Sequence, residues 1–196
     1  MTRKSEFKRK TKETDISVDL ELMSLKEARI NSGVPFFDHM LASFARHGRL
    51  FIDLQCRGDN DIDDHHTVED IGICLGTAFQ KALGDKAGIT RFGDAVVPMD
   101  DALTMVAVDL SGRPYFSHRG IELKGYINRF SEELTLEFLR SFAGNAGINL
   151  HINVLYGENR HHIHESIFKA MGVALYKAVS LDPFLAGSVL STKGTI

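Results

Sequence analysis

Two copies of a short histidine-rich motif are the strongest chemical signal in this chain of 196 residues. The pattern His-His-x-x-Glu stands at residues 65–69 and again at 161–165. On a helix, residues four apart lie on one face, so the first histidine and the glutamate of each motif can bind one metal ion. Adjacent residues point roughly 100° apart around the helix axis, so the second histidine of each motif must face elsewhere.

If pseudo-symmetry relates the two motifs, the second histidine of each motif can bind the metal ion of the other motif. If the motifs exchange these residues, two three-ligand sites result. One site takes His65, Glu69 and His162, and the other takes His161, Glu165 and His66. Two histidine pairs with glutamate at the same spacing are a much more specific signal than a single pair.

The preceding helix of each half can supply a fourth ligand. His39 occupies this place in the first half, and an offset of 98 residues leads to Glu137 in the second half. Imidazole and carboxylate donors without a thiolate suit manganese, iron, cobalt, nickel or zinc. Four protein ligands on a six-coordinate ion leave two positions for substrate or water, as metal-ion catalysis requires.

The elements that must position these residues also repeat along the chain. Phe44-Ala45 matches Phe142-Ala143 at an offset of 98, residues 58–60 resemble 157–159 at 99, and the two motifs lie 96 apart. Alternating apolar residues predict strands over 15–22, 50–56, 102–110 and 148–154. Apolar residues at helical spacing predict helices over 35–46, from Asp63 or Asp64 to Gly84, over 132–142 and over 161–180.

This duplication predicts an α+β fold with two pseudo-twofold-related halves, each a sheet with helices, packed together. One such unit cannot bury its apolar face alone, whereas two packed copies can. We therefore expect a single catalytic domain over residues 1–196, with repeats at roughly 13–95 and 100–185 and a C-terminal substrate-binding tail over 187–196.

Composition excludes other classes of protein. A formal net charge of -3 gives no reason to expect a nucleic-acid partner, and no run of residues is long and apolar enough to span a membrane. The basic residues among the first twelve are expected to form a solvated, partly ordered terminus. Cys56 and Cys74 stand in apolar patterns and are expected to be buried free thiols, which favours the cytoplasm.

Seven stretches of the chain closely resemble imidazoleglycerol-phosphate dehydratase. They are PFFDHML (35–41), GDNDIDDHHTVEDIGI (58–73), PMDDAL (98–103), VDLSGRP (108–114), LHI (150–152), GENRHHIHESIFKA (157–170) and STKG (191–194). The resemblance implies a lyase of histidine biosynthesis that converts D-erythro-imidazoleglycerol phosphate to imidazole acetol phosphate. It also implies two Mn²⁺ per subunit and an assembly of 24 subunits with active sites at subunit boundaries.

The resemblance assigns roles to further residues. Phosphate and substrate contacts carry over to Arg91, Arg113, Ser191 and Lys193, and guanidinium and ammonium groups suit a phosphate dianion. The whole substrate-binding set adds Glu13 and His39, and the catalytic set is Glu13, His65, Glu69, His161 and Glu165. The family often has a histidine at the position of Glu137, so metal affinity there is an open question.

The chemistry that we hypothesise starts from the imidazole ring of the substrate. The proton to be removed lies on a carbon without an adjacent carbonyl, so it is not acidic. A ring bound to manganese as imidazolate can push electrons toward the departing hydroxyl and acidify that C–H bond. Glu13, the family's acid/base carboxylate, would shuttle protons, and a phosphate clamp would orient the substrate.

Two other kinds of function stay open from the sequence. A dinuclear metal hydrolase acting on a phosphate ester or an amide could use the same motifs, but a lyase gives a ketone and releases no inorganic phosphate. A histidine-rich metal-storage or structural protein would not need the basic clamp or open coordination positions. His47, His118, His151 and His164 have no counterpart in the other repeat, so we place them outside the metal sites.

Overall fold

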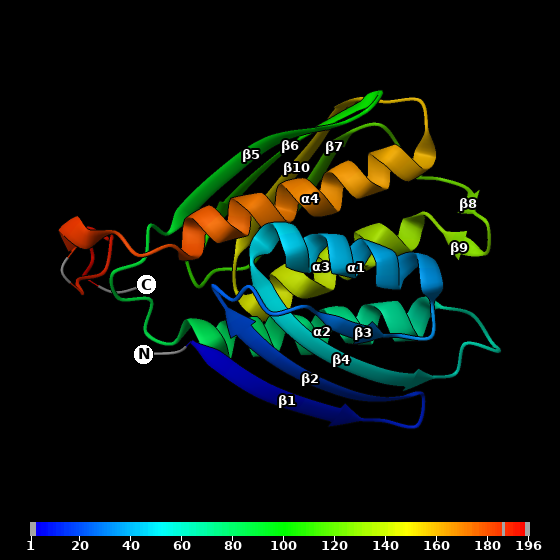
Figure 1. Ribbon diagram of the computed structural model, residues 1–196, viewed down its shortest axis with the longest axis horizontal. Coiled ribbons are helices and arrows are strands. Elements are labelled where there is room, and N and C mark those ends of the chain that lie inside the picture. The colour runs from blue at the N-terminus through cyan, green and yellow to red at the C-terminus, as the bar shows by residue number, and fades with distance from the viewer. Residues whose placement is uncertain (1–2, 186, 195–196) are drawn as a thin grey trace.

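The computed structural model describes residues 3–185 and 187–194 as two sheets with helices between them. Figure 1 shows the two sheets as the outer layers and the long helices packed between them. The expected α+β duplication is confirmed, because the two sheets have the same strand order and the same strand directions.

The first half contains one sheet and two helices. Its elements are β1 (Lys4–Lys10), β2 (Thr14–Leu22), β3 (Arg29–Asn31), α1 (Pro35–Gly48), β4 (Leu50–Gly58) and α2 (His65–Leu83). The sheet order is β1-β2-β4-β3, with β3 parallel to β4 and the other pairs antiparallel. Both helices contact strands of this sheet.

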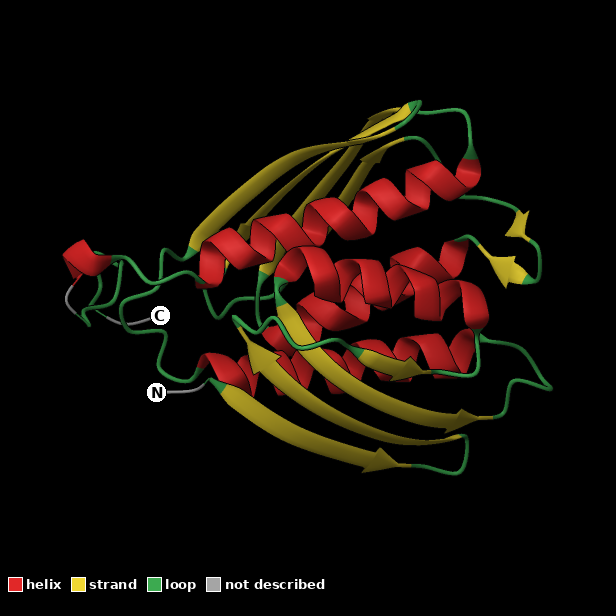
Figure 2. Cartoon of the chain, viewed as in Figure 1, coloured by secondary structure: helices red, strands yellow, loops and turns green. Residues whose placement is uncertain are grey.

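The second half repeats this arrangement. Its elements are β5 (Phe92–Met99), β6 (Ala102–Asp109), β7 (Tyr115–Gly120), α3 (Glu133–Ala146), β10 (Asn149–Tyr156) and α4 (Arg160–Val179). The sheet order is β5-β6-β10-β7, and only β7 with β10 is parallel. A small hairpin of β8 (Tyr126–Ile127) and β9 (Phe130–Ser131) precedes α3. The short helix η1 (Pro183–Leu185) and the tail lie beyond the end of α4 (Figure 2).

The expectation of a partly ordered N-terminus is wrong. Residues 4–10 form β1, which pairs along its whole length with β2. The exposed positions alternate with half-buried ones, so Lys4, Lys8 and Lys10 face solvent while Phe7 packs against the core. These lysines therefore form the outer face of an edge strand, and their charges obscured the strand pattern in the sequence. Strands β3, β5 and β7 were not expected either.

The helices of the two halves pack across the pseudo-twofold axis. Helix α1 contacts α4, and α2 contacts α3. A glycine allows each close approach: a Cβ on Gly172 would lie 2.7 Å from the carbonyl oxygen of Phe44, and one on Gly76 would lie 2.6 Å from that of Phe142. These pairs are related by the same 96- and 98-residue offsets as the sequence repeat, so the interface itself is duplicated.

The remaining expectations about composition have clear outcomes. Cys56 and Cys74 are buried free thiols, as expected. Burial raises the pKa of the Cys56 thiol to about 11 and that of the Cys74 thiol to about 12. Within the part of the chain that the structure describes, no helix has both the length and the apolar character needed to cross a membrane.

Candidate metal centre and phosphate site

The metal motifs stand at the first turns of α2 and α4, at the same end of the molecule (Figure 1). Asn159 caps α4, and its side-chain oxygen accepts the backbone N–H of His161 at 2.9 Å. At the start of α2 the oxygen of Asp63 accepts the N–H of His65 at 2.7 Å, whereas Asp64 makes no side-chain capping bond. These caps hold the motif backbones in register at the helix starts.

Three of the expected ligands converge on one point. His39 of α1 and His161 and Glu165 of α4 each offer a ligand atom, and these atoms all lie within 4.8 Å of one another. The Nε2 atom of His161 lies 3.3 Å from Oε2 of Glu165, and that of His39 lies 3.9 Å from the same oxygen. Ligand atoms about 2.1 Å from one ion are about 3–3.5 Å apart, so a small contraction would complete the cluster.

The donor set of this cluster fits a divalent ion such as Mn²⁺. It consists of two imidazoles and one carboxylate, without a thiolate. Lys169, one turn further along α4, places its Nζ atom 2.8 Å from the second oxygen of Glu165. Burial tends to raise the pKa of Glu165, but the hydrogen bond and charge of Lys169 outweigh it. The pKa therefore lies below its ordinary value, and the carboxylate is ready to bind a cation.

The motif at residues 65–69 is more open than the one at 161–165. Nε2 of His65 lies 3.9 Å from Oε2 of Glu69, and both side chains are about 40–45 % exposed. Glu137, the expected fourth ligand, instead accepts a hydrogen bond from Arg140 at 2.6 Å. Among the described residues only the cluster around His161 brings three ligand atoms together. The role of Glu137 as a ligand therefore remains a prediction.

The second histidine of each motif is held by a carboxylate. Nδ1 of His66 lies 3.0 Å from Asp59, and Nδ1 of His162 lies 2.5 Å from Asp101. The hydrogen bond with Asp59 raises the pKa of His66. The hydrogen bond from His162, followed by those from two backbone amides, lowers the pKa of Asp101. Such partners orient an imidazole and leave its Nε2 free to bind a metal.

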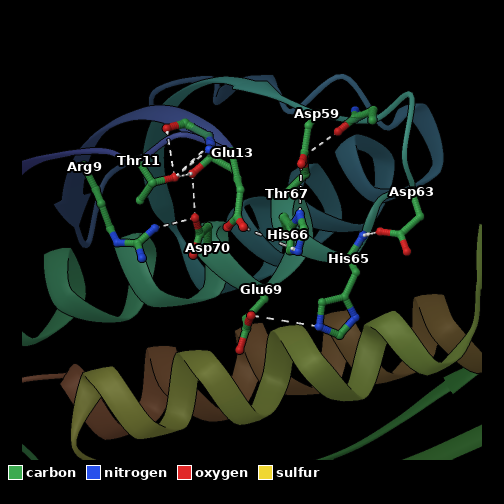
Figure 3. Close-up of polar contacts among 12 residues, drawn as sticks. Arg9, Thr11, Glu13, Asp59, Asp63, His65, His66, Thr67, Glu69 and Asp70 are labelled. Atoms are coloured by element: carbon green, nitrogen blue, oxygen red, sulfur yellow. Dashed lines mark hydrogen bonds and ion pairs between the residues drawn. The ribbon is translucent and has the colours of Figure 1, made fainter.

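The acidic residues around these histidines extend the site. Figure 3 shows Glu13, in the β1–β2 turn, directed toward His66. Its carboxylate lies 3.9 Å from Nε2 of His66. Asp100, in the β5–β6 turn, lies 3.5 Å from Nε2 of His162. Among the described residues, His66 does not join His161 and Glu165, and no cluster brings His162 to His65 and Glu69. The expected exchange of second histidines therefore stays a prediction, with partner chains as its place.

The expected phosphate-binding residues also come together, but elsewhere. A cavity of about 610 Å³ is lined by Arg91, Ser111, Arg113 and residues 189–193, which include Ser191 and Lys193. The Arg91 guanidinium donates two hydrogen bonds to Asp109, at 2.7 and 3.1 Å, and a third to the carbonyl oxygen of Leu190 at 2.7 Å. Residues 189–193 of the C-terminal tail thus form one wall of this cavity.

The metal cluster and this cavity lie at opposite ends of α4. The backbone N–H of Arg91 bonds to the carbonyl oxygen of Ala178, thirteen residues beyond Glu165 on that helix. At 1.5 Å per residue the two places are about 20 Å apart. Strand β6 gives the same result, because Asp101 before its start contacts His162 while Asp109 at its end contacts Arg91.

The structure identifies positioning residues that the sequence reasoning missed. Asp59, Asp101, Asp109 and Lys169 each hold a residue of the two sites. All four stand within stretches of the family resemblance, but the sequence analysis assigned roles only to other residues there. His164 lies outside the cluster, as expected. It is fully buried, with Nδ1 2.8 Å from the hydroxyl of Thr135.

Comparisons with known proteins show which family the chain resembles. A sequence profile of imidazoleglycerol-phosphate dehydratase matches residues 32–175. The imidazoleglycerol-phosphate dehydratases of Citrifermentans bemidjiense and Geobacter metallireducens are 53% and 51% identical to the chain, and each alignment covers the full length of both proteins.

Solved structures give the same answer. The crystal structure of imidazoleglycerol-phosphate dehydratase from Staphylococcus aureus has a TM-score of 0.80 at 36% identity, covering 91% of this chain and 100% of that one. The enzyme from Pyrococcus furiosus gives 0.82 at 37% identity, covering 97% and 100%. The chain therefore belongs to the imidazoleglycerol-phosphate dehydratase family.

Proposed function

We propose that this chain dehydrates imidazoleglycerol phosphate to imidazole acetol phosphate, a step of histidine biosynthesis, with two Mn²⁺ ions per subunit. The names of its full-length relatives support the reaction. The observation that carries the proposal is the cluster of His39, His161 and Glu165, in which three ligand atoms already lie within 4.8 Å of one another. The buried free thiols support a cytoplasmic location.

Two ligand sets follow from the geometry and the repeat. The first is His39, His161 and Glu165 with His66 of another copy, and the second is His65, Glu69 and Glu137 with His162 of another copy. Nε2 of His66 lies 3.9 Å from Glu13 and Nε2 of His162 lies 3.5 Å from Asp100, and neither histidine belongs to the cluster of its own chain. A bound manganese ion would supply Lewis acidity and a template for the imidazole ring.

Glu13 is the proposed acid/base group. It stands beside His66 at the end of the molecule where α2 and α4 begin, which we call the metal end. Its side chain is half exposed, so it can reach both solvent and a bound substrate. A carboxylate in this position can take the proton from the carbon next to the ring and deliver one to the leaving hydroxyl. Arg91, Arg113, Ser191 and Lys193 would bind the phosphate and so fix the orientation of the substrate.

The separation of the two ends requires more than one copy of the chain. The substrate extends less than about 10 Å from ring to phosphate, as its few bonds of about 1.5 Å allow. The metal end and the phosphate cavity of one chain are about 20 Å apart along α4. We therefore propose that the metal end of one subunit meets the phosphate cavity of another. This agrees with an assembly of 24 subunits with active sites at their boundaries.

The reaction can be tested with metal-stripped protein. Added Mn²⁺ should restore turnover of imidazoleglycerol phosphate, giving a ketone and no inorganic phosphate. Release of phosphate would instead support a hydrolase. Glu13→Gln should keep the metal content and abolish turnover, while Glu6→Gln on the exposed face of the same hairpin should change neither. Near-normal turnover of Glu13→Gln would remove Glu13 from the mechanism.

The shared site can be tested by mixing two variants and assaying at a substrate concentration so low that each variant alone is inactive. Glu13→Gln damages the metal end and Lys193→Ala damages the phosphate cavity. When the two chains are refolded together, some sites combine an intact end from each, and activity should return to at most about a quarter of the wild-type value. A mixed assembly as inactive as its parents would contradict a site shared between subunits.

A further inference from the structure

The turn that carries Glu13 has a fixed internal form. The hydroxyl oxygen of Thr11 accepts the backbone N–H of Glu13 at 3.1 Å and that of Thr14 at 3.0 Å. The N–H of Asp59 donates to the carbonyl oxygen of Glu13 at 3.1 Å. These bonds shape the turn and join it to the β4–α2 loop, but they do not tie it to helix α2.

Asp70 supplies that tie. It lies on α2 directly after the ligand Glu69, and its carboxylate is almost fully buried. The same oxygen, Oδ2, forms an ion pair with Arg9 and accepts the hydroxyl hydrogen of Thr14 at 2.5 Å. Arg9 is the next-to-last residue of β1 and Thr14 begins β2, so one carboxylate holds both sides of the turn. Figure 3 shows the contact between Arg9 and Asp70.

The second half shows that the fold itself does not need this charge. The motif offset of 96 places Ser166 at the position of Asp70. Ser166 makes a neutral hydrogen bond of 2.6 Å with Thr104 and another to a helix carbonyl oxygen. The β5–β6 turn contacts its motif directly, through the bond between Asp101 and His162. At this position of the repeat, a buried charge with its pairing cost is therefore present only in the half whose turn carries Glu13.

We propose that Asp70 is a positioning residue that holds Glu13 at the metal end of α2. The inference rests on the proposed role of Glu13 in the reaction. Because Glu69 and Asp70 are neighbours on one helix, the turn and the metal ligands move as one unit. Glu13 then keeps its place beside His66, with 3.9 Å between the carboxylate oxygen and Nε2.

The test replaces the carboxylate while keeping its shape. Asp70→Asn should raise the hydrogen-exchange rate of the amides of residues 11–14, which does not depend on activity. At saturating Mn²⁺, kcat should fall about 10- to 100-fold with KM within about threefold, as expected for a displaced catalytic group. Asp15→Asn is the matched control, because its exposed pair with Lys10 lies on the same hairpin and should leave both readouts unchanged.

A double variant separates positioning from general damage. If Asp70 acts through Glu13, Asp70→Asn should cause no further loss in the trace of product that Glu13→Gln forms at high enzyme concentration and long incubation. Additive losses, or unchanged exchange rates in the single variant, would overturn the proposal. If Asp70→Asn does not fold, Thr14→Val removes the second bond alone and should show the same changes at smaller size. If Glu13→Gln is active while exchange in Asp70→Asn rises, the role of Glu13 fails and the tie itself stands.

Discussion

Gly172 lies on α4 where that helix crosses α1, so an added methyl group tests how the metal cluster is spaced. A Cβ at this position would lie 2.7 Å from the carbonyl oxygen of Phe44 and 2.8 Å from the backbone nitrogen of Gly48. Ordinary contact begins at 3.4 Å, so α1 and α4 must separate by about 0.7 Å. His39 is carried by α1, and its partners His161 and Glu165 are carried by α4.

The energetic effect has two opposing parts. Alanine is favoured over glycine inside a helix by about 1 kcal/mol. Forcing a methyl group into a packed contact costs about 1–3 kcal/mol. Gly144 of α3 provides the matched control, because a Cβ there meets nothing within 4 Å. The helix preference is common to both variants, so Gly172→Ala should be about 1–3 kcal/mol less stable than Gly144→Ala.

The effect on metal binding follows from the cluster geometry. His39 already lies 3.9 Å from Glu165, so a further separation of about 0.7 Å takes its Nε2 out of reach of a shared ion. We expect Mn²⁺ affinity at this site to fall about 10- to 100-fold, the usual scale for a misplaced ligand. Gly144→Ala should bind Mn²⁺ as the wild type does.

Two measurements check the prediction on purified variants. Denaturant unfolding of metal-free protein gives the free energies of unfolding, and electron paramagnetic resonance of free Mn²⁺ gives the binding curve. If Gly172→Ala is as stable as Gly144→Ala and binds Mn²⁺ equally well, the glycine does not set the helix spacing, and the reasoning from the close contact is refuted.

Three shorter predictions concern other parts of the chain. Glu132→Gln should lower the free energy of unfolding by about 3 kcal/mol in denaturant titrations, because it leaves Arg160 without its buried partner. The control Glu122→Gln, in an exposed pair with a lysine, should change the free energy of unfolding by less than about 0.5 kcal/mol. Burial raises the pKa of the Cys74 thiol to about 12, so iodoacetamide at pH 8.5 should label Cys74 only in unfolded protein. Mass spectrometry measures the labelling, and rapid labelling of the native chain would contradict the burial. Lys193→Ala should raise KM for the phosphorylated substrate while Mn²⁺ affinity stays constant in equilibrium titrations, since this residue lines the cavity remote from the metal cluster.

Local pattern was enough to predict most elements. The helices around residues 35–48 and 65–83 and the strands around 14–22 and 149–156 agree with their apolar periodicity within a few residues. Periodicity failed at β1, because an edge strand with charged residues on its solvent face has little apolar signal. Its place is set by pairing with β2, which is a contact between segments and not a property of either one.

The sequence by itself predicted a donor set of imidazoles and carboxylates, because residue type and helical spacing are local properties of α2 and α4. It left open which motif His39 would join. The tertiary structure decided this, since α1 packs across the pseudo-twofold axis on α4 and brings His39 to Glu165. It also placed the cavity lined by Arg91 and Lys193 at the far end of α4 from the cluster of His39, His161 and Glu165. Distances between segments depend on packing between helices and sheets, and no local pattern records them.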